Sequence, residues 1–290
     1  MENLDMVIQC KTLLGSKNLD FSIACLQSFI QNSYDEVHLQ IFEDGSIDEQ
    51  HENKLLRALP NSTIVKKAIR NEVIEDKLAA YPNCLKFRNE NVLAQKLFDI
   101  ALFKEEDIFF IDSDIYFLKK FKLPAIDKDP VFIYDTQNAY SFHPANFLNV
   151  PYKIFPSINT GFFYFPYKLF NVVLLEEILS NKNVGQGFTK YKVWAEQTLW
   201  AFLSAPSQQI NYFDPAQIAM ARKQLLFDEH TVAIHLVSSY RYHYKELSET
   251  TQQTGSVYTD VKLLSTQKHL SKVNFLIERV NKIIGRYLTR

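Results

Sequence analysis

The chain lacks the features that mark several large protein classes. Its 290 residues include only seven glycines and three cysteines, and its net charge is −1. A charge so close to zero gives no general attraction to nucleic acid, so we expect no nucleic-acid partner. No stretch approaches the roughly 18 consecutive apolar residues that a membrane-spanning helix needs.

The cysteines and the N-terminal residues indicate a cytoplasmic protein. Cys10, Cys25 and Cys84 form an odd, scattered set without metal-ligand spacing, which is typical of buried thiols in a reducing compartment. The first five residues have neither the basic nor the apolar region of a secretory signal peptide. We therefore expect a cytoplasmic location.

Aromatic residues are abundant, with 23 Phe and 15 Tyr. A hydrophobic content of 47% and a charged content of 22% are ordinary for a globular protein of this length. Such an excess indicates a large core or a cleft that stacks on flat ligands, and for any single ring the core is favoured.

Strand and helix patterns alternate through the first 125 residues. Apolar runs predict strands at residues 6–10, 37–42, 62–67 and 108–111, and helical periodicity predicts helices at 20–30 and 91–103. The capping-box pattern Ser46-Ile47-Asp48-Glu49 predicts another helix start. This alternation is typical of a doubly wound α/β fold, in which the all-apolar run 108–111 would be a central strand buried on both faces.

The second half is irregular and aromatic, with strands expected at residues 131–134, 161–165 and 232–235. No repeat or clean linker divides the chain, so we predict one domain over residues 1–264 with two packed halves, about 1–125 and 126–264. A C-terminal amphipathic, basic helix is predicted within residues 265–290.

The strongest chemical signal is Asp112-Ser113-Asp114, directly after the predicted central strand. Ligands of open α/β sheets collect at the carboxyl ends of strands, and two carboxylates one residue apart can hold one Mn²⁺ or Mg²⁺ ion. The plain alternative is a pair of solvated loop acids. Haloacid-dehalogenase phosphatases also carry an acid-x-acid pair, but theirs usually opens the domain and is followed by different residues.

Three further groups could face the same site. Asn159-Thr160-Gly161 begins a strand, Glu196-Gln197 begins the helix expected over 198–204, and His235 ends a strand six residues before Arg241. Each has a structural alternative: a plain turn, an acid favoured by the helix dipole, a hydrogen-bonding histidine and a surface arginine.

Taken in this order, the groups resemble the GT-A glycosyltransferases, most closely the family 8-like group that includes glycogenin and lipopolysaccharide galactosyltransferases. That group carries an acid-x-acid motif, Asn-x-Gly, Asp-Gln and a terminal His-x-x-Gly-x-x-Lys, with a basic residue on the helix before the acid-x-acid strand. Lys96 occupies that last position here. The resemblance spans roughly residues 6–245 and implies a Rossmann-like mixed sheet flanked by helices.

The resemblance also implies a role for each group. Asp112, Asp114 and His235 would bind the metal, and Lys96 and Arg241 would neutralise the diphosphate of a nucleotide-sugar donor. Asn159, Glu196 and Gln197 would face the transferred sugar as catalytic residues. Lys11, Thr12 and Asp44 would line the nucleotide-base pocket, and Ser113 and Gly161 would complete the donor site.

Three departures from the family pattern are visible. Glu196 replaces an Asp, Ser238 replaces a Gly that lets a backbone amide approach phosphate, and Arg241 replaces a Lys. Tyr242 and His243 stand where Pro-Trp often follows. An inverting relative that uses Glu196 as a general base therefore stays open beside a retaining one, which we favour.

The resulting hypothesis is a metal-dependent glycosyltransferase of polysaccharide biosynthesis. It would move a sugar from a nucleotide-diphosphate donor, a UDP-sugar in the first instance, to a hydroxyl of a glycan or lipid-linked acceptor. The main alternative is a non-catalytic nucleotide-sugar or carbohydrate-binding protein on the same fold. A sugar-nucleotide pyrophosphorylase would need a glycine-rich loop after the first strand, and residues 11–17 contain a single glycine.

The last 23 residues alternate between apolar and basic positions at helical spacing. The apolar set is Val273, Leu276, Val280, Ile283, Ile284 and Tyr287, and the basic set is Lys268, Lys272, Arg279, Lys282, Arg286 and Arg290. Such a helix packs on its own domain or on a second subunit, or lies on an anionic membrane at the cytoplasmic face.

Overall fold

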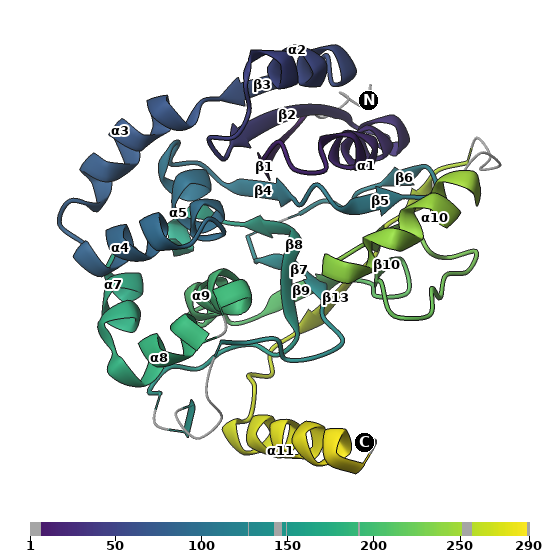
Figure 1. The fold of residues 1–290 in the computed structure, drawn as a ribbon. Coiled ribbons are helices and arrows are strands. Elements are labelled where there is room, and N and C mark those ends of the chain that lie inside the picture. The colour runs from purple at the N-terminus through teal and green to yellow at the C-terminus, as the bar shows by residue number, and fades with distance from the viewer. Residues whose placement is uncertain are drawn as a thin grey trace.

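The computed structural model describes residues 7–126, 128–141, 147–148, 150–190, 192–250 and 257–288. The N-terminal residues 1–6 and Arg290, which entered the expectations above, lie outside this part of the chain. An eight-stranded sheet runs through the molecule (Figure 1). In spatial order its strands are β13 (Leu263–Thr266), β9 (Ile210–Phe213), β7 (Val131–Tyr134), β8 (Ile158–Phe165), β4 (Ile108–Ile111), β1 (Val7–Leu14), β2 (Glu36–Glu43) and β3 (Ser62–Val65).

The sheet is mixed, and its two halves differ in direction. Strands β3, β2, β1 and β4 are parallel to one another, as the alternation of the first half predicts. Strand β8 then pairs antiparallel with both β4 and β7, and β9 is parallel to β7. The predicted α/β fold with a mixed sheet is therefore confirmed.

Strand β4 has all four residues buried, which confirms it as a central strand. Ile108 and Phe110 pack into the cluster on one face of the sheet, whereas Phe109 and Ile111 pack into the cluster on the other. A strand covered on both faces needs apolar side chains at every position, which explains the unbroken run.

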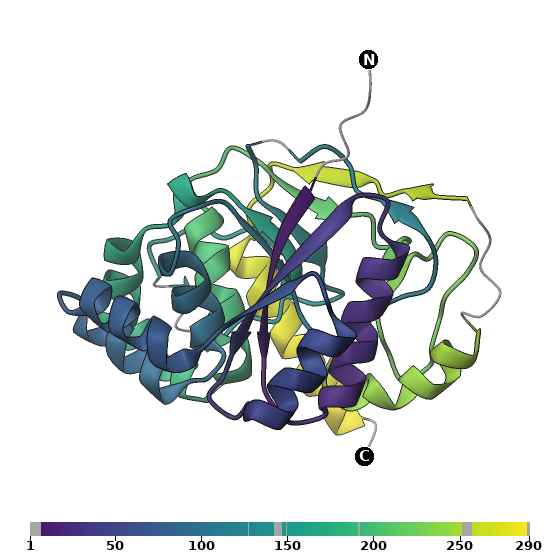
Figure 2. The same cartoon turned by 90° about the horizontal axis from the view of Figure 1, so that it is seen from above.

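Helices cover both faces of the sheet (Figure 2). Helix α1 (Leu19–Asn32) packs in the cluster on one face, together with Leu55 and Leu59 of the α2 region. Helices α5 (Ala94–Leu102) and α9 (Ala195–Ser204) pack on the opposite face, and every residue of both is buried. Among the described residues, the other α-helices are α2 (Glu49–Ala58), α3 (Lys67–Leu78), α4 (Pro82–Glu90), α7 (Val172–Ser180), α8 (Lys182–Lys190), α10 (Tyr244–Thr250) and α11 (Lys272–Leu288).

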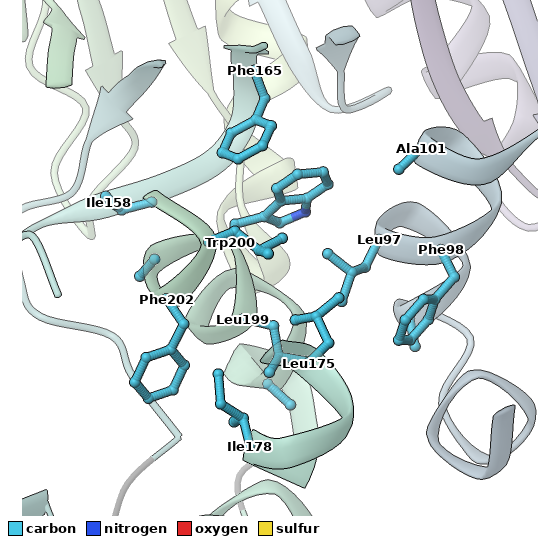
Figure 3. Packing of buried hydrophobic residues seen from close by; sticks show 14 of the residues in the cluster. Leu97, Phe98, Ala101, Ile158, Phe165, Leu175, Ile178, Leu199, Trp200 and Phe202 are labelled. Carbon is cyan, nitrogen blue, oxygen red and sulfur yellow. The ribbon is translucent and has the colours of Figure 1, made fainter. Parts of the chain in front are cut away.

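Trp200 of α9 lies within the hydrophobic cluster that α5 and α9 form with the sheet (Figure 3). Its ring lies 5.0 Å from the ring of Phe163 and 4.8 Å from that of Phe165, both on β8. Leu97 of α5 and Leu175 of α7 belong to the same cluster. Burying a large aromatic side chain and its neighbours stabilises a core by several kcal/mol, so this cluster fixes α5 and α9 against the sheet.

In the described parts of the chain, two small sheets and three 3₁₀ helices accompany the large sheet. Strand β5 (Ile115–Phe117) pairs with β11 (Ala233–His235), which pairs with β10 (Ile218–Met220). Strands β6 (Phe121–Lys122) and β12 (Thr259–Asp260) pair with each other. The 3₁₀ helices are η1 (Tyr167–Leu169), η2 (Lys192–Trp194) and η3 (Ser238–His243).

One local expectation, the helix cap at Ser46, was wrong. Helix α2 is capped by Asp48, whose side chain accepts a hydrogen bond from the His51 amide, and not by Ser46 of the proposed capping box. Ser46 instead donates from its hydroxyl to Asp44 and accepts from the Ser16 amide, which ties two neighbouring loops together. Its side chain is therefore engaged in the loop and is not available as the cap.

The C-terminal helix is present, but its basic residues do not all face solvent. Lys272 donates to the Leu148 and Val150 carbonyls, and Arg279 donates to the Asn138 and Tyr140 carbonyls. The residue that anchors α11 is Phe275, which is fully buried. An apolar stripe stays exposed on the described part of the helix: Val273, Ile277, Val280 and Ile284.

The three cysteines are free and buried, as predicted. Among the described residues, no helix combines the length and the apolar character needed to cross a bilayer. Strand β13 spans the boundary expected between residues 264 and 265, and the division of the chain into 1–264 and 265–290 stays a prediction.

Candidate functional site

The ends of three central strands lie together at one end of the large sheet. They line a cavity of about 770 Å³. Asp112 follows β4, Asn159 and Gly161 begin the antiparallel strand β8, and Asp135 follows β7. The Asp112 amide donates to the Gly161 carbonyl at 2.6 Å, which joins the acid-x-acid segment to β8. The sheet topology thus brings together groups that lie far apart in the sequence.

The small sheet brings His235 to the same place. Strand β11 pairs antiparallel with β5, so His235 lies opposite Ile115, and the Leu236 amide donates to the Asp114 carbonyl. His235 Nε2 is 3.1 Å from Asp114 Oδ1 and 4.0 Å from Asp112 Oδ2. One possible ligand atom from each of Asp112, Asp114 and His235 lies within 4.8 Å of the others.

The electrostatics of this cluster favour a positive charge between the carboxylates. Burial alone would lower the pKa of His235, but the nearby Asp114 and Asp112 carboxylates raise it above its ordinary value. Burial would raise the pKa of Asp114, yet His235 and Arg241 lower it to about 2. Burial raises the pKa of Asp112, and Lys96 opposes that shift.

The donor set suits a divalent cation. Two carboxylates and one imidazole nitrogen converge, and the raised pKa of His235 reflects the demand of the two acids for a cation at this point. Oxygen ligands suit Mg²⁺ and Mn²⁺, and the imidazole favours a transition metal. Asp112, Asp114 and His235 therefore form a candidate metal site.

Two long cationic side chains lie beside these acids. Lys96 Nζ is 3.1 Å from both Asp112 carboxylate oxygens and lies 4.6 Å from the Phe110 ring centroid. Arg241 Nη2 is 2.7 Å from Asp114 Oδ2, and 44% of the Arg241 side chain is exposed. Lys96 comes from the buried helix α5, so its position is rigid, whereas Arg241 reaches in from η3 at the rim.

Glu196 and Gln197 lie at the cavity wall on the first turn of α9. The Thr160 hydroxyl donates to Glu196 Oε2 at 3.1 Å and accepts from Lys96 Nζ at 3.3 Å, so it links the two charged groups. Glu196 Oε1 is buried, and the indole group of Trp200 lies near enough to this carboxyl group to lower its pKa. Burial raises the pKa of Glu196 to about 7 despite the proximity of Lys96.

The remaining predicted polar residues around the cavity are held by hydrogen bonds. Gln197 Nε2 donates to the Ala139 carbonyl at 3.0 Å. Asn159 Oδ1 accepts from the Gly161 amide at 2.9 Å, and Ser113 Oγ lies 3.2 Å from Ser22 Oγ. All of these except Ser22 line the cavity.

Gly161 is required here by the His235 ring. A Cβ atom at Gly161 would lie 2.3 Å from His235 Cε1 and 2.6 Å from Nδ1, closer than any real contact. The family resemblance placed Gly161 in the donor site. In the structure, a neighbouring side chain fills the space that the missing Cβ leaves.

The three residues expected at the base pocket do not reach the cavity. Lys11 Nζ donates to the Ile100 carbonyl and pairs with Glu106 at 3.2 Å. Thr12 is fully buried, and Asp44 accepts hydrogen bonds from the Ser46 amide and hydroxyl. Lys11 and Thr12 lie on β1, and Asp44 follows β2. Leu13, the residue next to Thr12, does line the cavity.

Asp135 is a cavity-lining acid that the sequence analysis missed. It is 5% exposed, and burial raises its pKa while hydrogen bonds from the Gln137 amide and the Asn159 side chain lower it. A usable signal was present, because Asp135 follows the predicted strand 131–134 as Asp112 follows 108–111. Acids directly after two strands that meet at one sheet edge indicate a shared site.

A buried charge network holds α5 behind the site. Arg70 and Arg88 both donate to the Asp99 carboxylate, at 2.6 Å and 2.8 Å, and Arg70 also donates to Gln95. Asp99 and Arg70 are fully buried. Because Asp99 lies three residues after Lys96 on α5, the network fixes the helix that positions the Lys96 ammonium group.

No protein-family model matches the chain, and no curated protein matches its sequence. Solved structures do share its fold. Mouse xyloside xylosyltransferase 1 superposes with a TM-score of 0.51 at 10% identity, covering 79% of this chain and 97% of that protein. The galactosyltransferase LgtC, solved with donor and acceptor sugar analogues, gives a TM-score of 0.52 at 11% identity, covering 86% of this chain and 97% of its own. The chain therefore has the GT-A glycosyltransferase fold that the order of its motifs predicts.

Proposed function

We propose that this protein is a metal-dependent glycosyltransferase that takes a sugar from a nucleotide-diphosphate donor, with a UDP-sugar as the first candidate. The acceptor is a hydroxyl of a glycan or of a lipid-linked sugar, as in polysaccharide biosynthesis. The cation is Mn²⁺ or Mg²⁺.

One observation carries this proposal. Asp112, Asp114 and His235, from two different sheets, converge within 4.8 Å in a large cavity at the carboxyl end of the central strand. Holding two carboxylates together in a buried place costs free energy, so such a cluster is typical of a functional site. The GT-A fold supports sugar transfer as the chemistry.

Each residue has a task in the proposed reaction. Asp112, Asp114 and His235 would hold the cation, which supplies Lewis-acid charge to the donor diphosphate when bound. Lys96 and Arg241 stand beside the same acids, so their charges oppose the negative charge that grows on the departing diphosphate. Asn159 and Gln197 line the wall where the transferred sugar would lie.

The proposed stereochemical course is retention, with Glu196 and Gln197 supporting an oxocarbenium-like transition state. Inversion is the second candidate, and one observation favours it. Burial raises the pKa of Glu196 to about 7, which suits a general base that works near neutral pH. Proton NMR of the anomeric centre in the first-formed product separates the two courses.

Turnover of nucleotide-sugars tests the function itself. Purified protein with Mn²⁺ should release UDP from at least one UDP-sugar, and Asp114→Asn should reduce the rate about a hundredfold because a neutral amide would replace a charged ligand of the cation. Tight UDP binding without release from any donor would favour a non-catalytic binding protein on the same fold. Absence of both would refute the proposal.

We further propose that the apolar stripe of α11 contacts a lipid surface in the cytoplasm, where a lipid-linked acceptor would be reached. Val273, Ile277, Val280 and Ile284 are 44–59% exposed and lie on one side of the helix. Ile277→Asp should abolish flotation with anionic vesicles if the stripe inserts. Equal flotation of both proteins rejects the idea, and a change from dimer to monomer would assign the stripe to a second copy instead.

A further inference from the structure

Among the described residues, three side chains of the cationic types Lys and Arg line the cavity, and they differ in their partners. Lys96 is bound to Asp112, and Arg241 is bound to Asp114. The third is Arg222, two residues after the end of β10. Within the described residues, its guanidinium group has neither a carboxylate partner nor a hydrogen-bond acceptor.

The backbone that carries Arg222 is held firmly. The Ala221 amide donates to the His235 carbonyl at 3.0 Å. The His243 Nε2 donates a hydrogen bond to the Arg222 carbonyl oxygen at 2.9 Å, because a carbonyl oxygen can only accept one. The Tyr242 hydroxyl lies 3.0 Å from the Lys223 carbonyl. Three consecutive residues are thus fastened to β11 and η3, so the side chain of Arg222 extends from a fixed point.

Its position at the rim distinguishes Arg222 from Lys96, and its lack of an acid partner in the described structure distinguishes it from Arg241, which also lies at the rim. Lys96 lies deep in the cavity, with 5% of its side chain exposed, whereas Arg222 is exposed at the rim. We expect the donor diphosphate to bind beside Asp112 and Asp114. The positive charges of Lys96 and Arg241, which contact these acids, would attract it there. The acceptor must enter afterwards from the mouth, past the rim.

We propose that Arg222 binds an anionic group of the acceptor, a carboxylate or a phosphate, and thereby selects acidic acceptors. The proposal rests on the function proposed above. A guanidinium group presents a planar pair of N–H donors that matches both anions, and with no internal partner it need not break an ion pair to bind one. Loss of such a charged contact should weaken binding about tenfold, which corresponds to about 1.4 kcal/mol.

Saturation-transfer NMR on the full chain with Mn²⁺ and saturating UDP tests this assignment. The probes are methyl β-D-glucuronide, methyl β-D-glucoside 6-phosphate and the neutral methyl β-D-glucoside. Wild-type protein should bind at least one anionic probe in preference to the neutral one. Arg222→Gln should lose that preference, and Lys223→Gln should keep it, because Lys223 is the adjacent exposed cation that does not line the cavity.

A calorimetric titration with UDP and Mn²⁺ separates the two possible sources of the anion. Arg222→Gln should bind UDP as wild type does, and a tenfold loss would assign the guanidinium group to the donor diphosphate and overturn the proposal. Equal binding of the anionic probes by Arg222→Gln, or no preference in the wild type, would overturn it as well. If wild-type protein failed to bind UDP at all, the proposed function itself would be refuted.

Discussion

Replacing Glu196 with glutamine should stabilise the protein at pH 8 and change its stability little at pH 5. Glu196 is 4% exposed, and burial raises its pKa from 4.5 to about 7 in the folded protein. In the unfolded chain the carboxyl group ionises near its ordinary value. The folded state therefore binds a proton more tightly than the unfolded state does.

The sign and size of the effect follow from this difference. Below about pH 4 the group is protonated in both states and has no pH-dependent effect. As the pH rises through the window from about 4.5 to 7, the unfolded state loses the proton first, so the free energy of unfolding falls. Above pH 7 the loss is complete and amounts to about 3 kcal/mol, the equivalent of the raised pKa. Glutamine fills the same volume without titrating.

Urea unfolding at pH 5, 6, 7 and 8 in the presence of a chelator measures this difference. The free energy of unfolding of Glu196→Gln minus that of wild type should rise across the series, and most of the rise should come before pH 7. Glu72→Gln, at an exposed position on α3, is the matched control and should give a difference that does not change with pH. A constant difference for Glu196→Gln would refute the assignment of a raised pKa to this carboxyl group.

Two further substitutions test the packing around the site. Gly161→Ala places a Cβ atom against the His235 ring, so calorimetric Mn²⁺ affinity should fall about 10- to 100-fold while the fold, followed by circular dichroism, is kept; unchanged affinity would show that the ring position does not matter. Asp99→Asn leaves the Arg70 and Arg88 charges buried without their carboxylate, so urea unfolding should show a loss of about 3–5 kcal/mol. A loss below 1 kcal/mol would contradict the role of this network.

Much of the site could be predicted because its strongest elements are local in sequence. The run of residues 108–111 is apolar throughout, and the position of Asp112 and Asp114 directly after it follows from the topology of α/β sheets. The motif order also predicted the GT-A fold. The resemblance predicted His235 as a metal ligand, and the pairing of β11 with β5 brings His235 beside Asp114 and Asp112.

What could not be predicted depends on long-range packing. The Arg70–Asp99–Arg88 network joins three helices, and nothing in the local pattern around Asp99 distinguishes a buried acid from a surface one. The direction of Lys11 depends on Glu106, a residue 95 positions away, and that of Lys272 depends on carbonyls before residue 151. Periodicity shows which residues of a helix are apolar, but not which side the rest of the chain covers.

The dependence of UDP binding on the cation tests the central claim most directly. In isothermal titration calorimetry, wild-type protein should bind UDP with Mn²⁺ present and lose at least tenfold in affinity when a chelator replaces the metal. Asp114→Asn, checked for folding by circular dichroism, should bind UDP weakly under both conditions, because a neutral amide would hold the cation less tightly than the Asp114 carboxylate. UDP affinity that is equal with and without Mn²⁺, in both proteins, would contradict a metal site formed by Asp112, Asp114 and His235.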